Sequence, residues 1–242
     1  MESNETIPLA RDGGRALVIM AKAPRPGMVK TRLADNLPAE APAELYRCLL
    51  DDTISLAHSL RGVKVAIMCP AADLKELAQL AGGKTMVVAQ QGEGLAAALT
   101  SVFAQFAAPR WRPVIAFNSD SPHLPVSVLA SAFEMLSVHD VVIGPTHDGG
   151  YYLVGAKTVH PALFDGDGMG TASALDALLA RARQLQLSVG FTEPFYDIDL
   201  ERDLMRLAAE LRVAPGRAPR TAAWLKQWQQ VAPQLRTAAG DL

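Results

Sequence analysis

Seven short apolar runs recur along the chain, separated by longer segments in which apolar positions follow helical spacing. The runs are mostly β-branched, and they are apolar throughout instead of alternating with polar residues. Such runs are typical of strands covered on both faces, as in a parallel sheet. The predicted strands are residues 16–21, 63–69, 85–89, 114–118, 141–144, 151–155 and 187–191.

Most segments between these runs predict helices. Strands that alternate with helices predict a three-layer α/β fold, with helices on both faces of a mostly parallel sheet. The predicted helices are residues 39–60, 71–80, 94–106, 125–136, 171–186 and 200–211. One connection breaks the alternation, because residues 145–150, which join the predicted strands 141–144 and 151–155, are too few for a crossover helix. We therefore predict an antiparallel insertion in the sheet at residues 151–155.

Composition narrows the class of protein. The chain has 242 residues, 50% of them hydrophobic and 20% charged, which argues against disorder. We expect a flexible N-terminus at residues 1–15 and a single domain at residues 16–242 that ends in a helix. A net charge of −2 lacks the basic excess of a duplex-binding protein, so no nucleic-acid partner is expected. No apolar stretch reaches the roughly 18 residues of a membrane span, so we expect no such span and a cytoplasmic protein.

Two pairs of residues bear on compartment and assembly. Cys48 and Cys69 have no Cys or His nearby at metal-ligand spacing, so a zinc site is not expected, and two lone cysteines suit a reducing compartment. Trp224 and Trp228 are four residues apart and share one face of a predicted helix. They either pack in the interior or form a homodimer interface.

A basic loop follows the first predicted strand. Residues 21–33 contain four cations, among them Lys22, Lys30 and Arg32, in a loop rich in Pro and Gly. Ligands of open α/β sheets bind at the carboxyl ends of the strands, where this loop must lie, and Lys, Arg and backbone N–H groups bind phosphate well. The spacing is that of neither a Walker A loop nor a dinucleotide fingerprint. The alternative is a solvated surface loop.

Two acidic segments are candidate metal sites. Asp120 ends the most apolar strand, and one or two carboxylates plus phosphate oxygens are a typical set of ligands for Mg²⁺ or Mn²⁺. Asp197 and Asp199 lie on one face if their segment is extended, and either one completes the site if the segment returns beside Asp120. The alternatives are that Asp120 and Asp199 cap the helices that follow them.

Residues 145–152 form a further candidate segment. Asp148, Gly149 and Gly150 indicate a turn, and the two glycines also allow a ligand to approach the backbone closely. Tyr151 and Tyr152 point to opposite sides of a strand, and we expect Tyr151 to face the cleft and Tyr152 the core. His147 is either part of a site or an unengaged loop histidine. The glycine-rich loop at residues 166–171 either acts as a lid or ends in a helix cap at Thr171.

Taken in order, residues 21–33, 119–124, 148–155, 170–171 and 197–204 resemble the glycosyltransferase-A-like group of the nucleotide-diphospho-sugar transferase superfamily. A more distant likeness, at residues 30–33, is to the phospholactate guanylyltransferases. The resemblance implies the fold of that superfamily. It implies that Lys22, Gly27, Lys30 and Arg32 receive nucleotide phosphates, that Asp120 binds metal with Asp199 or Asp197 nearby, and that residues 148–151 line the acceptor side.

The sequence therefore predicts a transferase that depends on a divalent metal, Mg²⁺ or Mn²⁺, and uses a nucleotide-activated donor. The leading version transfers a glycosyl group from a nucleotide-diphospho-sugar to a small-molecule acceptor, with Asp148 or His147 as general base. The alternative is a nucleotidyltransferase that uses a nucleoside triphosphate and releases pyrophosphate. An alternative of another class is a nucleotide-binding accessory protein without catalysis.

Overall fold

The structure is a computed structural model that describes residues 14–107, 111–165, 168–169 and 173–228. All seven predicted strands are present and form one sheet in the order β3-β2-β1-β4-β6-β5-β7. Their bounds are β1 Gly14–Met20, β2 Val63–Cys69, β3 Met86–Ala89, β4 Trp111–Asn118, β5 Val141–Pro145, β6 Tyr151–Ala156 and β7 Val189–Phe191.

The sheet is parallel except for one strand. β1 pairs in parallel with β2 and β4, β2 with β3, and β5 with β7. β6 is antiparallel to both of its neighbours, β4 and β5, which confirms the predicted insertion. Gly144 in β5 is required by this pairing, because a Cβ there would meet the ring of Tyr152 on β6 at 2.4 Å.

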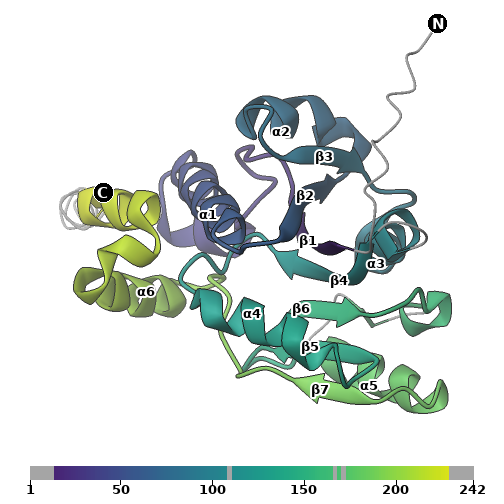
Figure 1. Cartoon of the computed structure of the whole chain (residues 1–242). Helices are drawn as coiled ribbons and strands as arrows, with labels where there is room; N and C mark the ends of the chain where they lie inside the picture. The colour runs from purple at the N-terminus through teal and green to yellow at the C-terminus, as the bar shows by residue number, and fades with distance from the viewer. Residues whose placement is uncertain (1–13, 108–110, 166–167, 170–172, 229–242) are drawn as a thin grey trace, which may run out of the picture.

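Helices cover both faces of the sheet (Figure 1), so the predicted three-layer α/β architecture is confirmed. One face packs against α1, α2 and α4 around Leu50, Leu77 and Leu129, and the other against α3 and α5 around Val102 and Leu178. The helices are α1 Ala41–His58, α2 Leu74–Leu80, α3 Gly94–Val102, α4 Val126–Met135, α5 Ala174–Gln184 and α6 Glu201–Val213.

Short helical turns complete several of the predicted helices. The predicted helix at residues 94–106 becomes π-helical after α3, and the segment ahead of α2 is a 3-10 turn. The short turns are η1 Thr31–Asn36, η2 Ala71–Asp73, η3 Phe103–Ala107, η4 Pro161–Leu163 and η5 Pro215–Arg217. The predicted Thr171 cap lies outside the described residues, as does most of the glycine-rich loop before it.

A third apolar cluster lies beside the sheet, between α1, α6 and a last helical stretch at residues 219–228. Asp52 of α1 fixes that stretch, since its buried carboxylate accepts the backbone N–H groups of Thr221 (2.8 Å) and Arg220 (3.3 Å). Trp224 packs against this cluster and stacks on Trp228, with ring centroids 5.9 Å apart. The packing role of Trp224 is thus observed, and an interface between two copies is untested.

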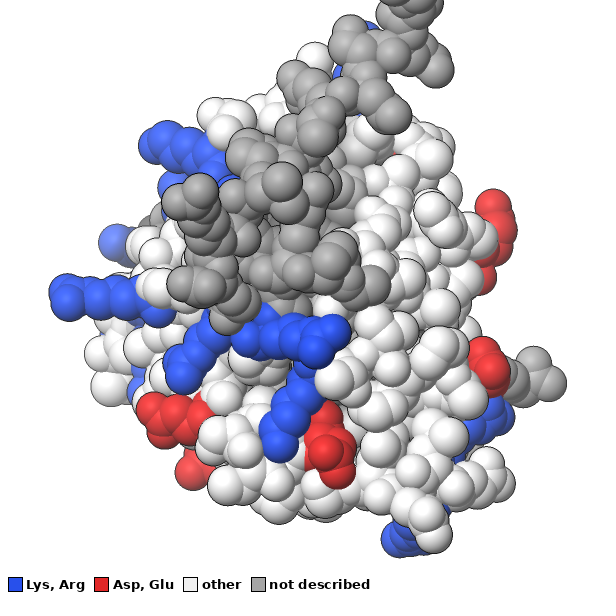
Figure 2. Space-filling model, turned by 45° about the vertical axis from the view of Figure 1, so that its right-hand side comes forward, with Lys and Arg blue, Asp and Glu red and all other residues white. Residues whose placement is uncertain are grey.

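Charge is mixed over the surface. On the face drawn in Figure 2, Lys and Arg side chains gather toward one side next to Asp and Glu side chains, and a broad area carries no charge. Within the described ranges, no helix is both long and apolar enough to cross a membrane.

Candidate functional site

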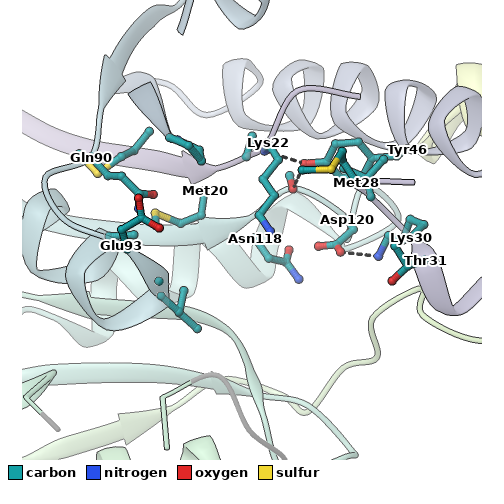
Figure 3. A pocket seen from close by; sticks show the side chains of 18 of the residues that line it. Met20, Lys22, Met28, Lys30, Thr31, Tyr46, Gln90, Glu93, Asn118 and Asp120 are labelled. Carbon is teal, nitrogen blue, oxygen red and sulfur yellow. Dashed lines mark hydrogen bonds and ion pairs between the residues drawn. The ribbon is translucent and has the colours of Figure 1, made fainter. Parts of the chain in front are cut away.

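A cavity of about 860 Å³ opens at the carboxyl ends of β1, β2, β3 and β4. The sheet order reverses between β1 and β4, and ligands of open α/β sheets bind at such a switch point. The basic loop, η2, α1 and the start of α3 contribute the remaining wall (Figure 3), together with Asp199 ahead of α6. Chemistry-bearing side chains along this wall are Lys22, Lys30, Tyr46, Gln90, Glu93, Asn118, Asp120 and Asp199.

Lys30 joins the two acidic segments that the sequence singled out. Its Nζ lies 2.5 Å from Asp120 Oδ2 and 3.1 Å from Asp199 Oδ1. Arg32 Nη1 lies 3.5 Å from Asp199 Oδ2. The Lys30 side chain is 4% exposed and that of Arg32 is 71% exposed, so the first is fixed inside the site and the second stands at its rim. Four predicted site residues therefore lie together.

The lysine is charged in this position. Burial lowers the pKa of Lys30, but the charges of Asp120 and Asp199 and their hydrogen bonds outweigh burial, so that the pKa is raised above its ordinary value. The backbone of Lys30 is left-handed (φ 49°, ψ 39°), a conformation that residues with side chains rarely adopt. The two ion pairs supply interactions that hold this conformation at the start of η1.

Asp197 faces the same group of charges from a more buried position. Its Oδ1 accepts hydrogen bonds from Asn118 Nδ2 (2.8 Å) and from Ser121 Oγ (3.3 Å). Burial, followed by the negative charge of Asp120, raises the pKa of Asp197 to about 7. Negative charge is therefore crowded beside Asp120, and a cation in addition to Lys30 would be electrostatically favoured there.

The structure shows that neither Asp199 nor Asp120 caps the helix that follows it. The helix α6 is capped by Asp203, whose Oδ2 accepts the N–H groups of Leu200 (2.8 Å) and Asp199 (3.2 Å). The Asp199 carboxylate is thus left for Lys30 and Arg32. Asp120 does not cap α4 either, because that helix has no side-chain cap and Asp120 pairs with Lys30.

Some residues of the basic loop reach the cavity, and others only anchor or shape the loop. Lys22 reaches into the cavity, and no described residue pairs with its ammonium group. Arg25 is turned away and binds Asp73 (2.8 Å) and Glu76 (2.9 Å), which anchors the loop to η2 and α2. Gly27 does not line the cavity; its φ of 72° favours glycine, so it shapes the loop.

Two residues of α1 that the sequence analysis did not single out hold the loops in place. The hydroxyl of Tyr46 accepts the N–H of Lys22 (3.1 Å) and bonds to Ser119 Oγ (2.8 Å). Thr53 Oγ1 donates to the carbonyl of Ser119 at 3.1 Å. Tyr46 and Thr53 are seven residues apart on one helix face, but that spacing is equally typical of plain core residues, so it gave no signal.

The turn at residues 145–152 lies outside the cavity wall. The Asp148 carboxylate accepts hydrogen bonds from Thr146 Oγ1 (2.5 Å) and from the N–H of Gly150 (3.3 Å), inside its own turn. The Thr146 hydrogen bond is the largest cause of the lowered pKa of Asp148. His147 and Asp148 are exposed, and Gly149 has a φ of 90°. The expected turn is observed, and neither residue touches a described group of the cavity.

The two tyrosines lie on opposite faces of β6, as expected for neighbours in a strand. Tyr152 is buried, and its hydroxyl bonds to Thr192 Oγ1 (2.6 Å) and donates to the Glu193 carbonyl (2.9 Å). Tyr151 packs against the α3 and α5 side of the sheet, with its hydroxyl 3.8 Å from Met169 Sδ. Tyr151 does not line the cavity, so the position of Tyr152 is confirmed and a cleft-facing Tyr151 is not observed.

The residues at Asp120 fit a divalent metal that is shared with a ligand. Within the described part of the chain, no three His, Cys, Asp or Glu side chains are arranged to hold a metal by themselves. Mg²⁺ commonly binds one or two carboxylates and completes its shell with phosphate oxygens and water. Asp120 and Asp199, both at the cavity wall, with Asp197 behind them, provide oxygen donors of that kind.

The far end of the cavity is different in character. Gln90 and Glu93 converge there, after β3 and away from Asp120 (Figure 3). Gln90 Nε2 donates to the carbonyl of Gly92 at 2.9 Å, and within the described residues the Glu93 carboxylate has no partner. The Met20 side chain lies between the two ends (Figure 3), and Met68 also lines the cavity. The cavity therefore has one end where Lys30 pairs with two carboxylates and another where Gln90 and the Glu93 carboxylate offer polar groups.

Comparison with known proteins supports the fold. Residues 53–171 match a family described as uncharacterised proteins conserved in bacteria, DUF2064. A candidate nucleotide-diphospho-sugar transferase from Desulfovibrio desulfuricans G20 is 28% identical, with a TM-score of 0.84 over 92% of this chain and 98% of that one. A search of curated proteins gave no match.

More distant structures share the architecture. A nucleotidyl transferase from Methanothermobacter is 17% identical, with a TM-score of 0.59 over 84% of this chain and 100% of that one. A Mycobacterium tuberculosis protein solved in complex with manganese is 17% identical, with a TM-score of 0.52 over 81% and 98% of the two chains. The resemblance seen in the sequence is thereby confirmed: this chain has the nucleotide-diphospho-sugar transferase fold and resembles the glycosyltransferase-A-like group.

Proposed function

We propose that this protein is a metal-dependent transferase that uses a nucleotide-activated donor, most simply a nucleotide-diphospho-sugar. The observation that carries the proposal is the meeting of Lys30, Asp120 and Asp199 at the switch point of the sheet. A buried lysine beside two carboxylates at this position is what a site for a metal and a diphosphate needs. The likeness to a candidate nucleotide-diphospho-sugar transferase supports the same class.

The donor lies along the cavity with its phosphates at the basic end. Lys22 extends into the cavity without an ion-pair partner among the described residues, and Lys30 and Arg32 both pair with Asp199. Charge-assisted hydrogen bonds from these groups stabilise phosphate oxygens. The nucleobase then lies between the methionines and the Gln90 and Glu93 end, where polar acceptors can read its edge.

Asp120 and Asp199 would hold the divalent metal, with Asp197 as the alternative second ligand. When bound, Mg²⁺ or Mn²⁺ neutralises charge on the diphosphate leaving group. Lys30 keeps the two carboxylates within reach of one another and adds its own positive charge at the phosphates. The manganese complex of a protein with the same fold is in keeping with this choice of metal.

The acceptor approaches from the turn at residues 147–151. The charge of Asp148 contributes to the raised pKa of Asp197, and the charge of Arg32 lowers the pKa of Asp148, so this turn is within electrostatic range of the cluster. Asp148 is ionised at neutral pH and can accept a hydroxyl proton, with His147 as the alternative base. Gly149 and Gly150 would shape that side, whereas Tyr151 packs on the α3 and α5 side of the sheet.

A second candidate function is nucleotidyl transfer, which uses the same groups but attacks the α-phosphate of a nucleoside triphosphate. A nucleotidyl transferase has the same fold as this chain, and this similarity supports nucleotidyl transfer as the second candidate. A non-catalytic nucleotide-binding role is the remaining alternative. Two free cysteines are consistent with the cytoplasm as the proposed compartment.

One experiment separates these functions. The protein is incubated with Mn²⁺ and a metabolite extract, together with either nucleotide-diphospho-sugars or nucleoside triphosphates, and products are followed by mass spectrometry. Glycosyl transfer releases nucleoside diphosphate from the sugar nucleotides only, whereas nucleotidyl transfer releases pyrophosphate from the triphosphates only. Metal-dependent nucleotide binding with neither product would support the accessory role.

A further inference from the structure

His123 is a buried side chain that the proposed function does not use. It lies three residues after Asp120, in the loop between β4 and α4, and its ring is 0% exposed. Neither ring nitrogen has a hydrogen-bond partner among the described residues. Burying an unpaired donor is unfavourable, and most buried polar groups are paired. The ring must therefore contribute something other than a hydrogen bond.

The ring of His123 contacts two aromatic residues that directly precede the second acidic segment. Its centroid lies 5.0 Å from that of Phe195 and 4.5 Å from that of Tyr196. Phe195 and Tyr196 stack on each other at 5.7 Å, and the guanidinium of Arg206 lies 3.8 Å above the Tyr196 ring. A continuous aromatic cluster, in which the His123 ring is tilted against both neighbours, thus runs from the Asp120 loop to α6.

Tyr196 belongs both to this aromatic cluster and to the segment that carries the two carboxylates. Tyr196 and Ile198 point into the third apolar cluster, whereas Asp197 and Asp199 point to the side of Asp120 and Lys30. The contacts of residues 196–199 thus alternate between the apolar cluster and the acidic group, so holding Tyr196 in place restricts the direction of both carboxylates. Burial, with the nearby charges of Arg206 and Arg217, lowers the pKa of His123 to about 3, so the ring is neutral at neutral pH and able to stack.

We infer that His123 is a positioning residue whose ring, packed on Phe195 and Tyr196, holds the Asp197–Asp199 segment against the Asp120 loop. The role attributed to that segment rests on the proposed function, but the contact itself does not. Shape and stacking carry the role, so an apolar aromatic ring should replace the imidazole and a small side chain should not.

The test uses hydrogen exchange of the full chain, followed by mass spectrometry, in wild type, His123→Phe and His123→Ala. In His123→Ala we expect exchange of peptides within residues 193–200 to rise about tenfold or more, with little change in the central strands β1 and β4. His123→Phe should match wild type. If His123→Ala does not fold, His123→Leu, which fills the space without a planar ring, replaces it with the same expectation.

Unchanged exchange at residues 193–200, an equal rise throughout the chain, or equal loosening in His123→Phe would each overturn the inference. A second arm measures binding of Mn²⁺ alone by electron paramagnetic resonance, with Asp120→Asn as reference. Weaker Mn²⁺ binding in His123→Ala but not in His123→Phe is the expected result. If wild type binds no Mn²⁺, the proposed metal site fails, and the exchange data still decide the role of His123.

Discussion

Lys30 and Asp120, 90 residues apart in the chain, form a partly buried ion pair in which the ammonium group also contacts Asp199. The pair connects the loop after β1 to the loop after β4, the two parallel strands between which the strand order of the sheet reverses. It brings the phosphate-binding and metal-binding halves of the proposed site to one point.

Removal of Lys30 or Arg32 should weaken diphosphate binding more than nucleoside binding. Lys30→Ala and Arg32→Ala each remove a charge next to Asp199, so the affinity for a nucleoside diphosphate should fall by about tenfold, or ~1.4 kcal/mol, and become less sensitive to salt. Calorimetric titration at two salt concentrations measures both effects.

Arg25→Ala is the matched control, because Arg25 belongs to the same loop but binds Asp73 and Glu76. Its effect on diphosphate affinity should be small. Equal losses for nucleoside and diphosphate in the Lys30 and Arg32 variants would indicate that the loop is only structural.

Asp148→Asn separates a role in catalysis from a role in the turn. If Asp148 accepts the acceptor's proton, turnover should drop strongly while donor affinity is nearly unchanged. Thr146→Val is the control, since it removes the hydroxyl that donates to Asp148 and leaves the carboxylate in place. Similar losses of thermal stability in both variants, with turnover reduced no further in Asp148→Asn, would favour a role confined to the turn.

Substitutions at the far end of the cavity test the orientation of the donor. Glu93→Ala should weaken binding of a preferred nucleoside diphosphate several-fold and leave pyrophosphate binding unchanged, because only the base reaches this end. Affinities for both ligands are compared by competition. If Glu93→Ala weakened pyrophosphate binding more than nucleotide binding, the phosphates would lie near Glu93, and the proposed orientation of the donor would be wrong.

Asp197 predicts a pH dependence of stability. Its pKa in the folded protein, about 7, lies above the ordinary value of 3.8, so the folded state holds a proton that the unfolded state has lost between those values. The free energy of unfolding contributed by Asp197 should therefore be greatest below about pH 3.8 and decrease as pH rises toward 7. Asp197→Asn should remove this decrease, which urea denaturation of both proteins across the range will show.

Much of this arrangement could be predicted from the sequence, for identifiable reasons. The strands are short and uniformly apolar, and the Asp-Gly-Gly turn is too short for a helix, so the antiparallel β6 follows from spacing alone. Lys30 and Asp120 were predicted to lie at one end of the sheet because both follow predicted strands. Tyr46, Thr53 and His123 were not identified, because each acts through a contact with a residue distant in sequence.

The sequence pattern around residues 145–152 also did not show the direction in which the Asp148 and Tyr151 side chains point. The Asp148 carboxylate binds Thr146 and Gly150, and Tyr151 packs on the side of α5, although both residues suit a ligand site by type. Which side of the sheet each β6 side chain faces depends on the pairing of β6 with β4, and that register is a property of the whole sheet.

The central claim is that Asp120 and a divalent metal together bind the diphosphate of a nucleotide donor. The most direct measurement is the affinity of wild type and Asp120→Asn for a panel of nucleoside diphosphates, with and without Mn²⁺, by calorimetry. Wild type should bind at least one of them with Mn²⁺ markedly more tightly than without it, and Asp120→Asn should lose about tenfold or more of that metal-dependent affinity, ~1.4 kcal/mol, while remaining folded. Equal affinities with and without metal, or an Asp120→Asn variant that binds as wild type does, would contradict the account.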